Sequence, residues 1–460
     1  MQSPNALRKV QAREPWPAGL KYNVFTERQL DKIPQLATLS SEQRFAMRVV
    51  ASVLPFRVNE YVVNELIDWN NIPDDPVFRL TFPQSGMLHE GDFGRVADAL
   101  RAQADKETLQ ALVNSIRAKL NPHPAGQQRL NVPRIGDQRL SGMQHKYRET
   151  VLFFPSQGQT CHAYCTFCFR WAQFIGDKSL RFSSHEADTL HRYLADHRQV
   201  SDLLVTGGDP MVAKTKHLAA YLEPLLKPEF DHIKTVRVGT KSLTFWPYRY
   251  VTDPDADDLL RLLEKLANGG KHVALMAHFN HGRELETEIC REAVRRLRDA
   301  GVIIRTQAPL LRHINDDAKV WADMWRAQVN MGMVPYYMFV ERDTGARHYF
   351  EVPLARAWTI YSEAMRQVSG LGRTARGPSM SAGPGKVEVQ GVTEVNGEKV
   401  FALRFIQGRN PDWVQRPFFA KYDPHATWLD QLKPAFGEAK FFFEDQYDSM
   451  QAGRVDPLGF

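Results

Sequence analysis

The chain contains 460 residues, of which 43% are hydrophobic, so it can bury one large core with extensions or two domains. Its 59 basic and 53 acidic residues give a formal charge of +6 that is spread along the sequence, unlike the concentrated basic face of a nucleic-acid-binding protein. The sequence shows no signal peptide, no apolar run of the ~20 residues that a membrane span requires and too few cysteines for a disulfide scaffold, so we expect a cytoplasmic protein without nucleic-acid or membrane partners.

Residues 1–140 are predicted to be mainly helical, with helices at 41–52 and 92–120. Further along, strand-like runs alternate with segments of helical periodicity. The strand-like runs are 151–154, 203–206, 235–239, 272–277, 302–306 and 334–340. The helical segments between them are 185–197, 216–226, 255–267, 283–299 and 318–331. This alternation predicts an α/β fold with a parallel sheet.

Unusual polar residues follow five successive predicted strands. They are Gly207-Gly208-Asp209-Pro210, Lys241 with Ser242, His278-Phe279-Asn280-His281, Gln307, and Glu341-Arg342-Asp343. In a β/α barrel the carboxyl ends of the strands carry the active site. The register therefore predicts a partial (β/α)6 TIM-like barrel whose strand ends share one mouth.

The segment after this core is predicted to form a mixed C-terminal extension. Residues 386–405 match a hairpin that turns at Asn396-Gly397, a strong hairpin signal. Residues 411–447 are rich in Phe and Trp and are expected to pack against the body or a partner subunit. We accordingly divide the chain into a helical N-terminal region (1–140), a barrel (141–375) and the extension (376–460).

Three of the four cysteines, Cys161, Cys165 and Cys168, have C-x3-C-x2-C spacing. Three thiolates at this spacing can hold three irons of a [4Fe–4S] cluster and leave the fourth iron open to a small-molecule ligand, whereas an electron-transfer cluster normally has four thiolates. The alternatives are a zinc site completed by His162 and buried cysteines that act as small hydrophobes. The spacing favours the open cluster, and Cys290, on the apolar stripe of a predicted helix, is expected in the core.

A lysine, Lys386, ends the small-residue loop Ser381-Ala382-Gly383-Pro384-Gly385 just before a predicted strand. A Gly-rich approach lets a planar ligand come close to the backbone, and such a lysine can form a Schiff base with an aldehyde cofactor. Taken alone, a Gly-Pro-Gly turn before a strand is more often only a turn. His278 and His281 alone make a poor metal site, and packing with cofactor contact is the favoured interpretation.

In combination, these motifs resemble the lysine 2,3-aminomutase family of radical S-adenosylmethionine, pyridoxal-phosphate-dependent enzymes. The similarity covers most of the chain, from Leu54-Pro55-Phe56-Arg57-Val58-Asn59 and Leu66-Ile67-Asp68-Trp69 to Lys386. Between them the landmarks keep their order: the cysteine motif with Phe169-Arg170, the Gly-Gly-Asp-Pro and His-Phe-Asn-His runs, Gln307 with Leu310-Leu311-Arg312 and Asn315-Asp316, and Pro335-Tyr336-Tyr337.

The resemblance implies three cofactors: a [4Fe–4S] cluster, S-adenosylmethionine on its open iron, and pyridoxal 5′-phosphate on Lys386. It implies an isomerisation in which a 5′-deoxyadenosyl radical takes hydrogen from Cβ and the amino nitrogen migrates from Cα to Cβ. Gly207, Gly208 and Asp209 would approach the amino group of S-adenosylmethionine, with Gln307 and His278 as further cofactor contacts. Arg170 would hold the substrate carboxylate or lie against the pyridoxal ring.

The resemblance also implies partners: a small-molecule amino acid, an electron donor such as flavodoxin or ferredoxin, and further copies of the chain in a homo-oligomer. Lys146 matches a basic phosphate-binding position of the family. A second basic position nearby is occupied by Thr150, and Arg148 is the candidate to replace it. No cysteine follows Cys290, so the C-terminal zinc cluster of some relatives is absent from this sequence.

The substrate positions depart most from the family. Relatives that act on free lysine are expected to hold its ammonium with two carboxylates, and this chain has Arg342 and Ser379 at those places. We therefore expect a glutamate-like or polar substrate, although Glu341 and Asp343 flank Arg342 and a one-residue shift would restore a carboxylate. The alternatives are a lysine 2,3-aminomutase proper, a protein-lysine-modifying relative, and a non-catalytic Fe–S scaffold.

Overall fold

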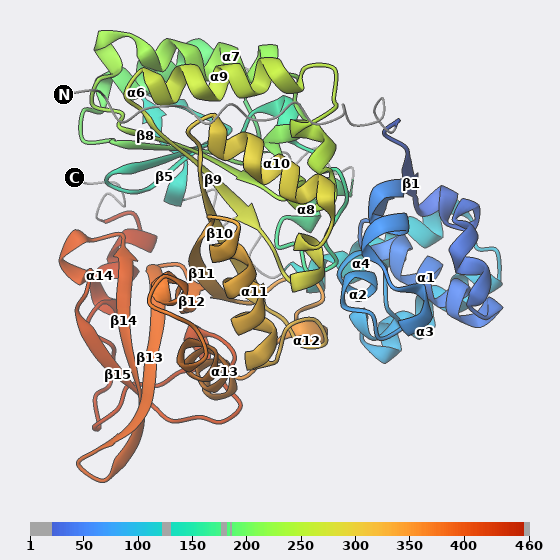
Figure 1. Ribbon diagram of the computed structural model, residues 1–460. Coiled ribbons are helices and arrows are strands. Elements are labelled where there is room, and N and C mark those ends of the chain that lie inside the picture. Colours follow the sequence, from blue (N-terminus) through green and yellow to red (C-terminus); the bar gives the residue numbers. More distant parts are fainter. Residues whose placement is uncertain (1–20, 122–129, 176–181, 185, 455–460) are drawn as a thin grey trace.

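An eleven-stranded sheet, in which the strands follow one another in chain order from β5 to β15, runs through the molecule (Figure 1). The computed structural model describes residues 21–121, 130–175, 182–184 and 186–454. Strands β6 to β12 run parallel to one another, whereas β5 pairs antiparallel with β6 and the strands from β12 to β15 pair antiparallel in turn. The mixed α/β class is thus confirmed.

The six predicted strands coincide with β6 to β11. These strands are β6 (Thr150–Phe153), β7 (Asp202–Val205), β8 (Thr235–Thr240), β9 (His272–His278), β10 (Ile303–Leu310) and β11 (Val334–Val340). They are flanked by β5 (Met143–Tyr147) and β12 (Arg376–Ser381). Short runs of β-branched and apolar residues between helical segments were sufficient to locate them.

Helices cover one face of this sheet. They are α6 (Ala187–Asp196), α7 (Thr215–Leu222), α9 (Ala256–Asn268), α10 (Glu288–Asp299), α11 (Ala318–Asn330) and α13 (Leu354–Arg366). The predicted helix at 283–299 starts later than expected, because the Thr287 hydroxyl caps α10 by accepting a hydrogen bond from the Cys290 amide. His185, the expected start of α6, lies outside the described residues.

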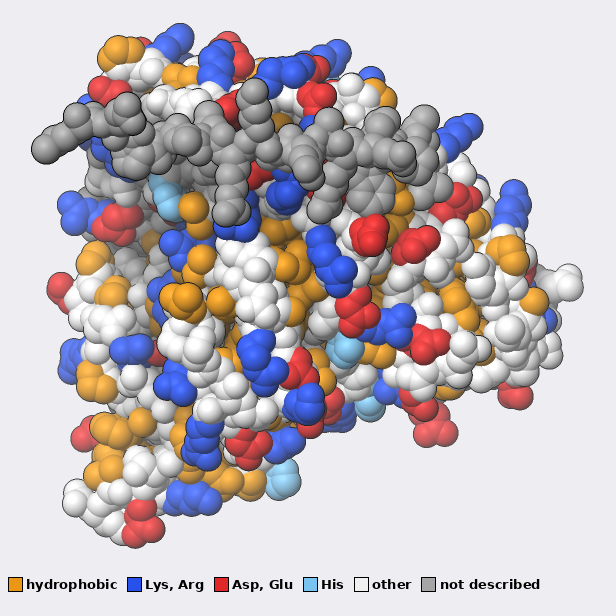
Figure 2. All heavy atoms as spheres, viewed as in Figure 1, with side chains coloured by type: hydrophobic (Ala, Val, Ile, Leu, Met, Phe, Trp, Pro, Cys, Tyr) orange, Lys and Arg blue, Asp and Glu red, His pale blue; other side chains and the backbone are white. Residues whose placement is uncertain are grey.

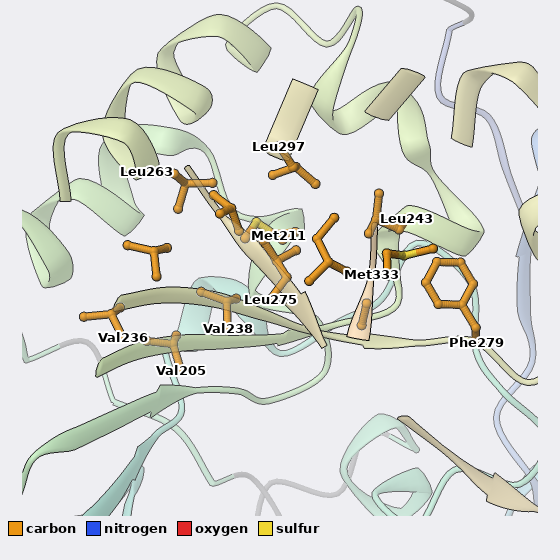
Figure 3. Packing of buried hydrophobic residues seen from close by; sticks show 14 of the residues in the cluster. Val205, Met211, Val236, Val238, Leu243, Leu263, Leu275, Phe279, Leu297 and Met333 are labelled. Carbon is orange, nitrogen blue, oxygen red and sulfur yellow. The ribbon is translucent and has the colours of Figure 1, made fainter. Parts of the chain in front are cut away.

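The main core lies between the sheet and these helices (Figure 3). Val205, Val236 and Val238 project from the strands toward Leu263 of α9 and Leu297 of α10. Each is at most 1% exposed, and burying such side chains contributes about 1.5–3 kcal/mol apiece. Cys290 belongs to this core, as predicted.

The opposite face of the strands is polar. Alternation along a strand turns every second side chain away from the helices, and on that face Arg237 of β8 pairs with Asp202 of β7. Arg305 of β10 lies over the ring of Tyr336, 5.4 Å from its centroid. Because the helices cover the apolar face, we expect ligands to bind on the polar face.

The N-terminal part is built from short helices beside the carboxyl ends of the strands. It contains α1 (Ser41–Val53), α2 (Pro76–Thr81), α3 (Glu90–Arg101), α4 (Lys106–Leu120) and a ladder between β1 (Val24–Thr26) and β2 (Arg57–Asn59). The single helix predicted at 92–120 is wrong. The chain breaks at Gln103, whose φ is 51°, and the Asp105 carboxylate then caps α4 by accepting from the Thr108 amide.

The predicted hairpin is confirmed. Strands β13 (Gly385–Val395) and β14 (Glu398–Gly408) turn at Asn396 and Gly397, which have φ values of 50° and 79°. Strand β15 (Pro417–Lys421) and helix α14 (Glu444–Gln451) complete the extension. Its aromatic residues pack within the chain, with Phe418 and Phe443 against Phe405.

The surface mixes charges of both signs. Figure 2 shows Lys and Arg interspersed with Asp and Glu over the visible face. Among the described residues, no helix combines the length and apolar character needed to cross a membrane.

Candidate active site

The three clustered cysteines lie on the loop that follows β6, and the N-terminal region holds this loop by its backbone. Asn59 donates from Nδ2 to the carbonyls of His162 (3.1 Å) and Phe245 (2.8 Å). The amide of Tyr164 donates to the Arg57 carbonyl and that of Thr166 to the Leu80 carbonyl. The fold therefore fixes the loop through hydrogen bonds that do not involve the thiols.

The side chains of Cys161, Cys165 and Cys168 are half-buried. Burial raises the pKa of Cys168 to about 11, although the Arg170 amide and guanidinium oppose that shift. Burial also raises the pKa values of Cys161 and Cys165, while the Arg57 and Lys241 cations act in the opposite direction. Metal binding would have to displace these protons, as it does in metal centres generally.

The spacing of these cysteines predicts a cluster. Within the described ranges, no group of three or more His, Cys, Asp or Glu side chains is arranged to hold one metal ion. A cubane differs because each thiolate binds a separate iron. His162, the candidate fourth zinc ligand, is 5% exposed, its Nδ1 has no hydrogen-bond partner, and burial lowers its pKa to about 3.

The Gly-Gly-Asp run after β7 packs directly against the start of the cysteine loop. The Gly208 amide donates to the Gly158 carbonyl and the Asp209 amide to the Thr160 carbonyl. A Cβ at Gly208 would lie 2.5 Å from the Thr160 oxygen, so only glycine fits there. The close approach that we expected toward S-adenosylmethionine is thus made, in part, to the protein's own loop.

Asp209 is likewise engaged by the protein. Its buried carboxylate accepts hydrogen bonds from the Thr240 hydroxyl and from the amides of Lys241 and Met211. Burial raises its pKa to about 6 in spite of these bonds. The structure therefore gives Asp209 a role in joining the ends of β7 and β8, beside its predicted role toward a ligand.

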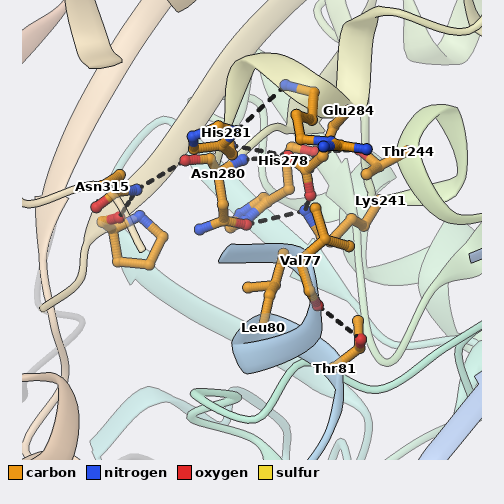
Figure 4. Close-up of polar contacts among 12 residues, drawn as sticks. Val77, Leu80, Thr81, Lys241, Thr244, His278, Asn280, His281, Glu284 and Asn315 are labelled. Atoms are coloured by element: carbon orange, nitrogen blue, oxygen red, sulfur yellow. Dashed lines mark hydrogen bonds and ion pairs between the residues drawn. The ribbon is translucent and has the colours of Figure 1, made fainter. Parts of the chain in front are cut away.

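A buried ion pair, which the sequence did not single out, lies next to the cysteines (Figure 4). Lys241 Nζ lies 2.8 Å from Glu284 Oε1 and 2.9 Å from Asn280 Oδ1. Asn280 in turn has a buried Nδ2 without a hydrogen-bond partner, and its carbonyl accepts from Asn315 Nδ2. Lys241 and Asn280 come from strand ends that the sequence marked, whereas Glu284, on the short helix Gly282–Leu285, carried no signal.

His278 and Gln307 meet on neighbouring strands. They are register partners of β9 and β10, and Gln307 Nε2 lies 3.1 Å from His278 Nε2. Burial lowers the pKa of His278 to about 3, so its ring is neutral. The two predicted cofactor contacts are therefore brought together.

Lys386 lies at the start of β13, near the polar face of the sheet. Its Nζ is 4.8 Å from the centroid of the Tyr337 ring. Burial, together with the Arg237 and Arg376 guanidiniums, lowers the pKa of the amine to about 7. A lysine of which about half is neutral at pH 7 is a competent nucleophile toward an aldehyde, so this residue fits pyridoxal phosphate.

A group of cations surrounds this position. Lys146 donates from Nζ to the Ala382 carbonyl at 2.6 Å. Burial is the main cause that lowers its pKa, and the cations Arg409, Arg342 and Lys386 add to this effect. Arg170 lies over the Phe154 ring at 4.4 Å, and the nearby Arg342 cation adds to the burial that lowers its pKa to about 10. Arg409, Arg342 and Lys386 therefore all lie close to Lys146, and Arg170 lies close to Arg342.

Arg148 does not join this group. It is exposed at the turn between β5 and β6, where its carbonyl faces the His145 ring. Thr150 is engaged in donating its hydroxyl to Asp202. Arg409, which follows β14, was missed, because nothing in its local sequence connects it to a loop more than twenty residues earlier.

The predicted substrate residues include unsatisfied polar atoms. Ser379, fully buried on β12, has a hydroxyl without a partner, and Arg342 Nε is also unpartnered by hydrogen bonds. Arg342 pairs loosely with Asp343, with 3.7 Å between Nε and Oδ1. Burial raises the pKa of Glu341 well above its ordinary value, which favours its neutral acid form. Buried polar atoms without partners are rare and often face a ligand.

Comparison with known proteins identifies relatives along most of the chain. A putative L-lysine 2,3-aminomutase of Aquifex aeolicus is 29% identical over 412 residues, which is 89% of this chain and 95% of that protein. The Bacillus subtilis L-lysine 2,3-aminomutase is 25% identical over 84% of this chain and 71% of its own length. That of Escherichia coli is 32% identical, but the match spans only 50% of this chain and 63% of the relative.

Other comparisons add little. No protein-family model matches the sequence. The crystal structure of Streptococcus suis SuiB is 14% identical over 59% of this chain and 56% of that chain, with a TM-score of 0.32. A similarity of this size supports no argument.

The cysteine loop, the lysine loop and these relatives together define the class as a radical S-adenosylmethionine isomerase. The resemblance noted in the sequence is confirmed, because the chain is similar to proteins of the lysine 2,3-aminomutase family, at 25–32% identity. The family uses a [4Fe–4S] cluster, S-adenosylmethionine and pyridoxal phosphate, the three cofactors that the sequence predicts.

Proposed function

We propose that this chain is an amino-acid 2,3-aminomutase that converts an L-α-amino acid with an acidic or hydrogen-bonding side chain, such as glutamate, into its β-amino acid. The observation that carries the substrate class is Arg342, a cation whose side chain is 23% exposed and whose Nε is buried without a hydrogen-bond partner. A guanidinium that is largely shielded from water and lacks a full set of partners favours an anionic or acceptor group beside it. The ε-ammonium of lysine would be repelled there.

The partial (β/α)6 barrel belongs to this proposal. Its support is the run of parallel strands from β6 to β11, with helices on one face and polar groups at the carboxyl ends. Residues 141–375 would then form the catalytic body, with the N-terminal region and the C-terminal extension on either side. The lysine loop of the extension would close the polar face.

In this reaction the cofactors supply a carbon-centred radical and a π system on the migrating nitrogen, which no side-chain acid or base provides. The protein binds and orients. Cys161, Cys165 and Cys168 would hold the cluster, and Lys386 would carry pyridoxal phosphate until substrate arrives. Arg170 would hold the substrate carboxylate, and the apolar ring of Phe154 beneath it limits hydration of the guanidinium.

Arg342 and Ser379 would contact the substrate side chain and determine which side chains are accepted. The two carboxyl groups adjacent to Arg342 neutralise its positive charge only in part. The pKa of Glu341 is raised well above its ordinary value, which favours the uncharged acid, and Asp343 Oδ1 lies 3.7 Å from Arg342 Nε. The names of the relatives support lysine as the second candidate substrate. A small-molecule amino acid and an external electron donor are common to both candidates.

The test is an anaerobic screen of the twenty amino acids with reconstituted protein, in which β-amino-acid products are identified by mass spectrometry. We expect turnover of glutamate or another polar amino acid to exceed that of lysine. The double variant Arg342→Asp, Ser379→Asp should shift the preference toward lysine, whereas Arg366→Asp, on the last turn of α13, should leave it unchanged. Strong turnover of lysine with none of glutamate or neutral amino acids would contradict the proposed substrate class.

A further inference from the structure

Two cationic side chains from distant parts of the chain form hydrogen bonds with the loop that carries Lys386. Lys146 of β5 donates to the Ala382 carbonyl at 2.6 Å. Arg409 donates from Nε to the Gly383 carbonyl at 2.9 Å, and its amide donates to the Pro384 carbonyl at 3.0 Å. Three successive carbonyls of the loop are thus held, and the Arg409 cation lies close enough to Lys146 to contribute to its lowered pKa.

Neither cation has a carboxylate partner. Among the described residues, Lys146 and Arg409 take part in no ion pair, although Arg409 is only 3% exposed. The remaining partners of the Arg409 guanidinium are neutral: the Leu130 carbonyl, the Asn131 side-chain oxygen and the Tyr447 hydroxyl. Burying cations without a counter-charge is costly, and here they also repel each other.

Both heads retain hydrogen-bonding capacity. An ammonium has three N–H groups and Lys146 uses one of them, while a guanidinium has five and Arg409 uses at most four. Lys146 is also partly exposed, although burial is the main cause of its lowered pKa.

Thr150 stands where the family has its second basic phosphate-binding residue, so this chain lacks a cation at that position. Arg148, the candidate to replace it, is exposed at a turn. Arg409, which comes from the C-terminal extension, provides a second cation near Lys146. An anion bound between them would neutralise both charges and lie beside the lysine loop. A phosphate monoester suits this arrangement, because guanidinium and ammonium donors together match its oxygens.

We propose that Lys146 and Arg409 form the binding site for the phosphate group of the aldehyde cofactor held on Lys386, with Arg409 supplying the cation that position 150 lacks. This inference rests on the proposed function. It assigns a ligand-binding role to the segment just after β14.

The test compares two aldehydes that differ only in the phosphate, pyridoxal 5′-phosphate and pyridoxal, with apoprotein of wild type, Arg409→Gln, Arg409→Lys and Arg416→Gln. Arg416 is an exposed arginine of the same segment and serves as the control. Affinity is measured by absorbance titration, and attachment at Lys386 by borohydride reduction and peptide mass.

We expect Arg409→Gln to weaken binding of the phosphorylated aldehyde by ~10- to 100-fold, the loss of charge-assisted hydrogen bonds, and to leave pyridoxal binding unchanged. Arg409→Lys should recover part of the affinity, and Arg416→Gln should match wild type. Inorganic phosphate should compete with the phosphorylated aldehyde in wild type but only weakly in Arg409→Gln, which separates a phosphate site from a site for substrate carboxylate.

Equal weakening for both aldehydes, or none for either, would overturn the assignment of Arg409. If Arg409→Gln does not fold, as judged by circular dichroism, the affinities for the phosphorylated and unphosphorylated aldehydes are compared in Arg409→Lys and Lys146→Gln instead. Failure of wild type to attach the phosphorylated aldehyde at Lys386 would instead contradict the proposed function. The two failures are therefore distinguishable.

Discussion

The hydroxyl of Thr240, at the end of β8, lies 2.7 and 2.9 Å from the two carboxylate oxygens of Asp209, which follows β7. This contact joins two strand ends next to the cysteine loop, because the amide of Asp209 also donates to the Thr160 carbonyl. A residue that was expected to face a ligand thus also stabilises the rim on which the site is built.

The pH dependence of stability should reveal this buried carboxyl. Burial raises the pKa of Asp209 to about 6, above the ~3.9 of an unfolded chain, so the folded state binds the proton more tightly. Its contribution to stability is full below about pH 4 and falls as the pH rises through 6. The difference in Tm between Asp209→Asn and wild-type apoprotein should therefore become more favourable to the variant from pH 4.5 to 7. Asp98→Asn, on an exposed side chain, should show a constant difference.

Iron content should separate the clustered cysteines from the core cysteine. Replacing Cys161, Cys165 or Cys168 with serine removes one of three iron ligands, so anaerobic reconstitution should lose most of its iron, sulfide and visible absorbance. Cys290→Ser should retain the cluster and only lose stability, because that thiol is fully buried in the core. Full iron loading in a Cys165→Ser variant would refute the ligand assignment.

The reactivity of Lys386 should follow its lowered pKa of about 7. Only the neutral amine attacks an aldehyde, so the rate of attachment of pyridoxal phosphate should rise about tenfold per pH unit below 7 and level off above about 8. Stopped-flow absorbance between pH 5.5 and 9 measures this. Lys386→Arg should abolish the borohydride-fixed adduct, whereas Lys399→Arg, an exposed lysine of the same hairpin, should not change it. A rate that still rises steeply at pH 9 would contradict the lowered pKa.

Asn59, which holds the cysteine loop, should contribute both to the stability of the protein and to the retention of its cluster. Asn59→Ala removes two donors to buried carbonyls and an acceptor for the Val62 amide, at a cost of about 1–3 kcal/mol for each group left unsatisfied. We expect a lower Tm of the apoprotein and faster loss of iron to a chelator. Gln35→Ala removes an exposed bond to Asn64 and should change neither.

The sequence predicted the strands well, because β6 to β11 are short apolar runs separated by amphipathic helices. It also placed the hairpin, where Asn396 and Gly397 adopt the positive φ values that such a turn requires. The break at Gln103 escaped notice because the flanking residues are good helix formers. A single residue with φ of 51° outweighed local propensity there.

The site was predictable where chemistry depends on spacing and unpredictable where it depends on tertiary contact. The cysteine triplet and the Gly-rich loop are local signals. By contrast, Arg409 reaches Gly383, and Lys241 reaches Glu284, across the fold. The packing reason for Gly208 was equally hidden, because its close neighbour Thr160 belongs to another loop.

The carbonyl bonds from Asn59 and the amide bonds to Arg57 and Leu80 have a consequence for the life of the enzyme. We expect a loop that is held in this way to keep its form after oxidation has removed the iron, because none of these bonds involves a thiol. Reloading a damaged molecule would then need fresh iron, sulfide and electrons, without unfolding of the chain.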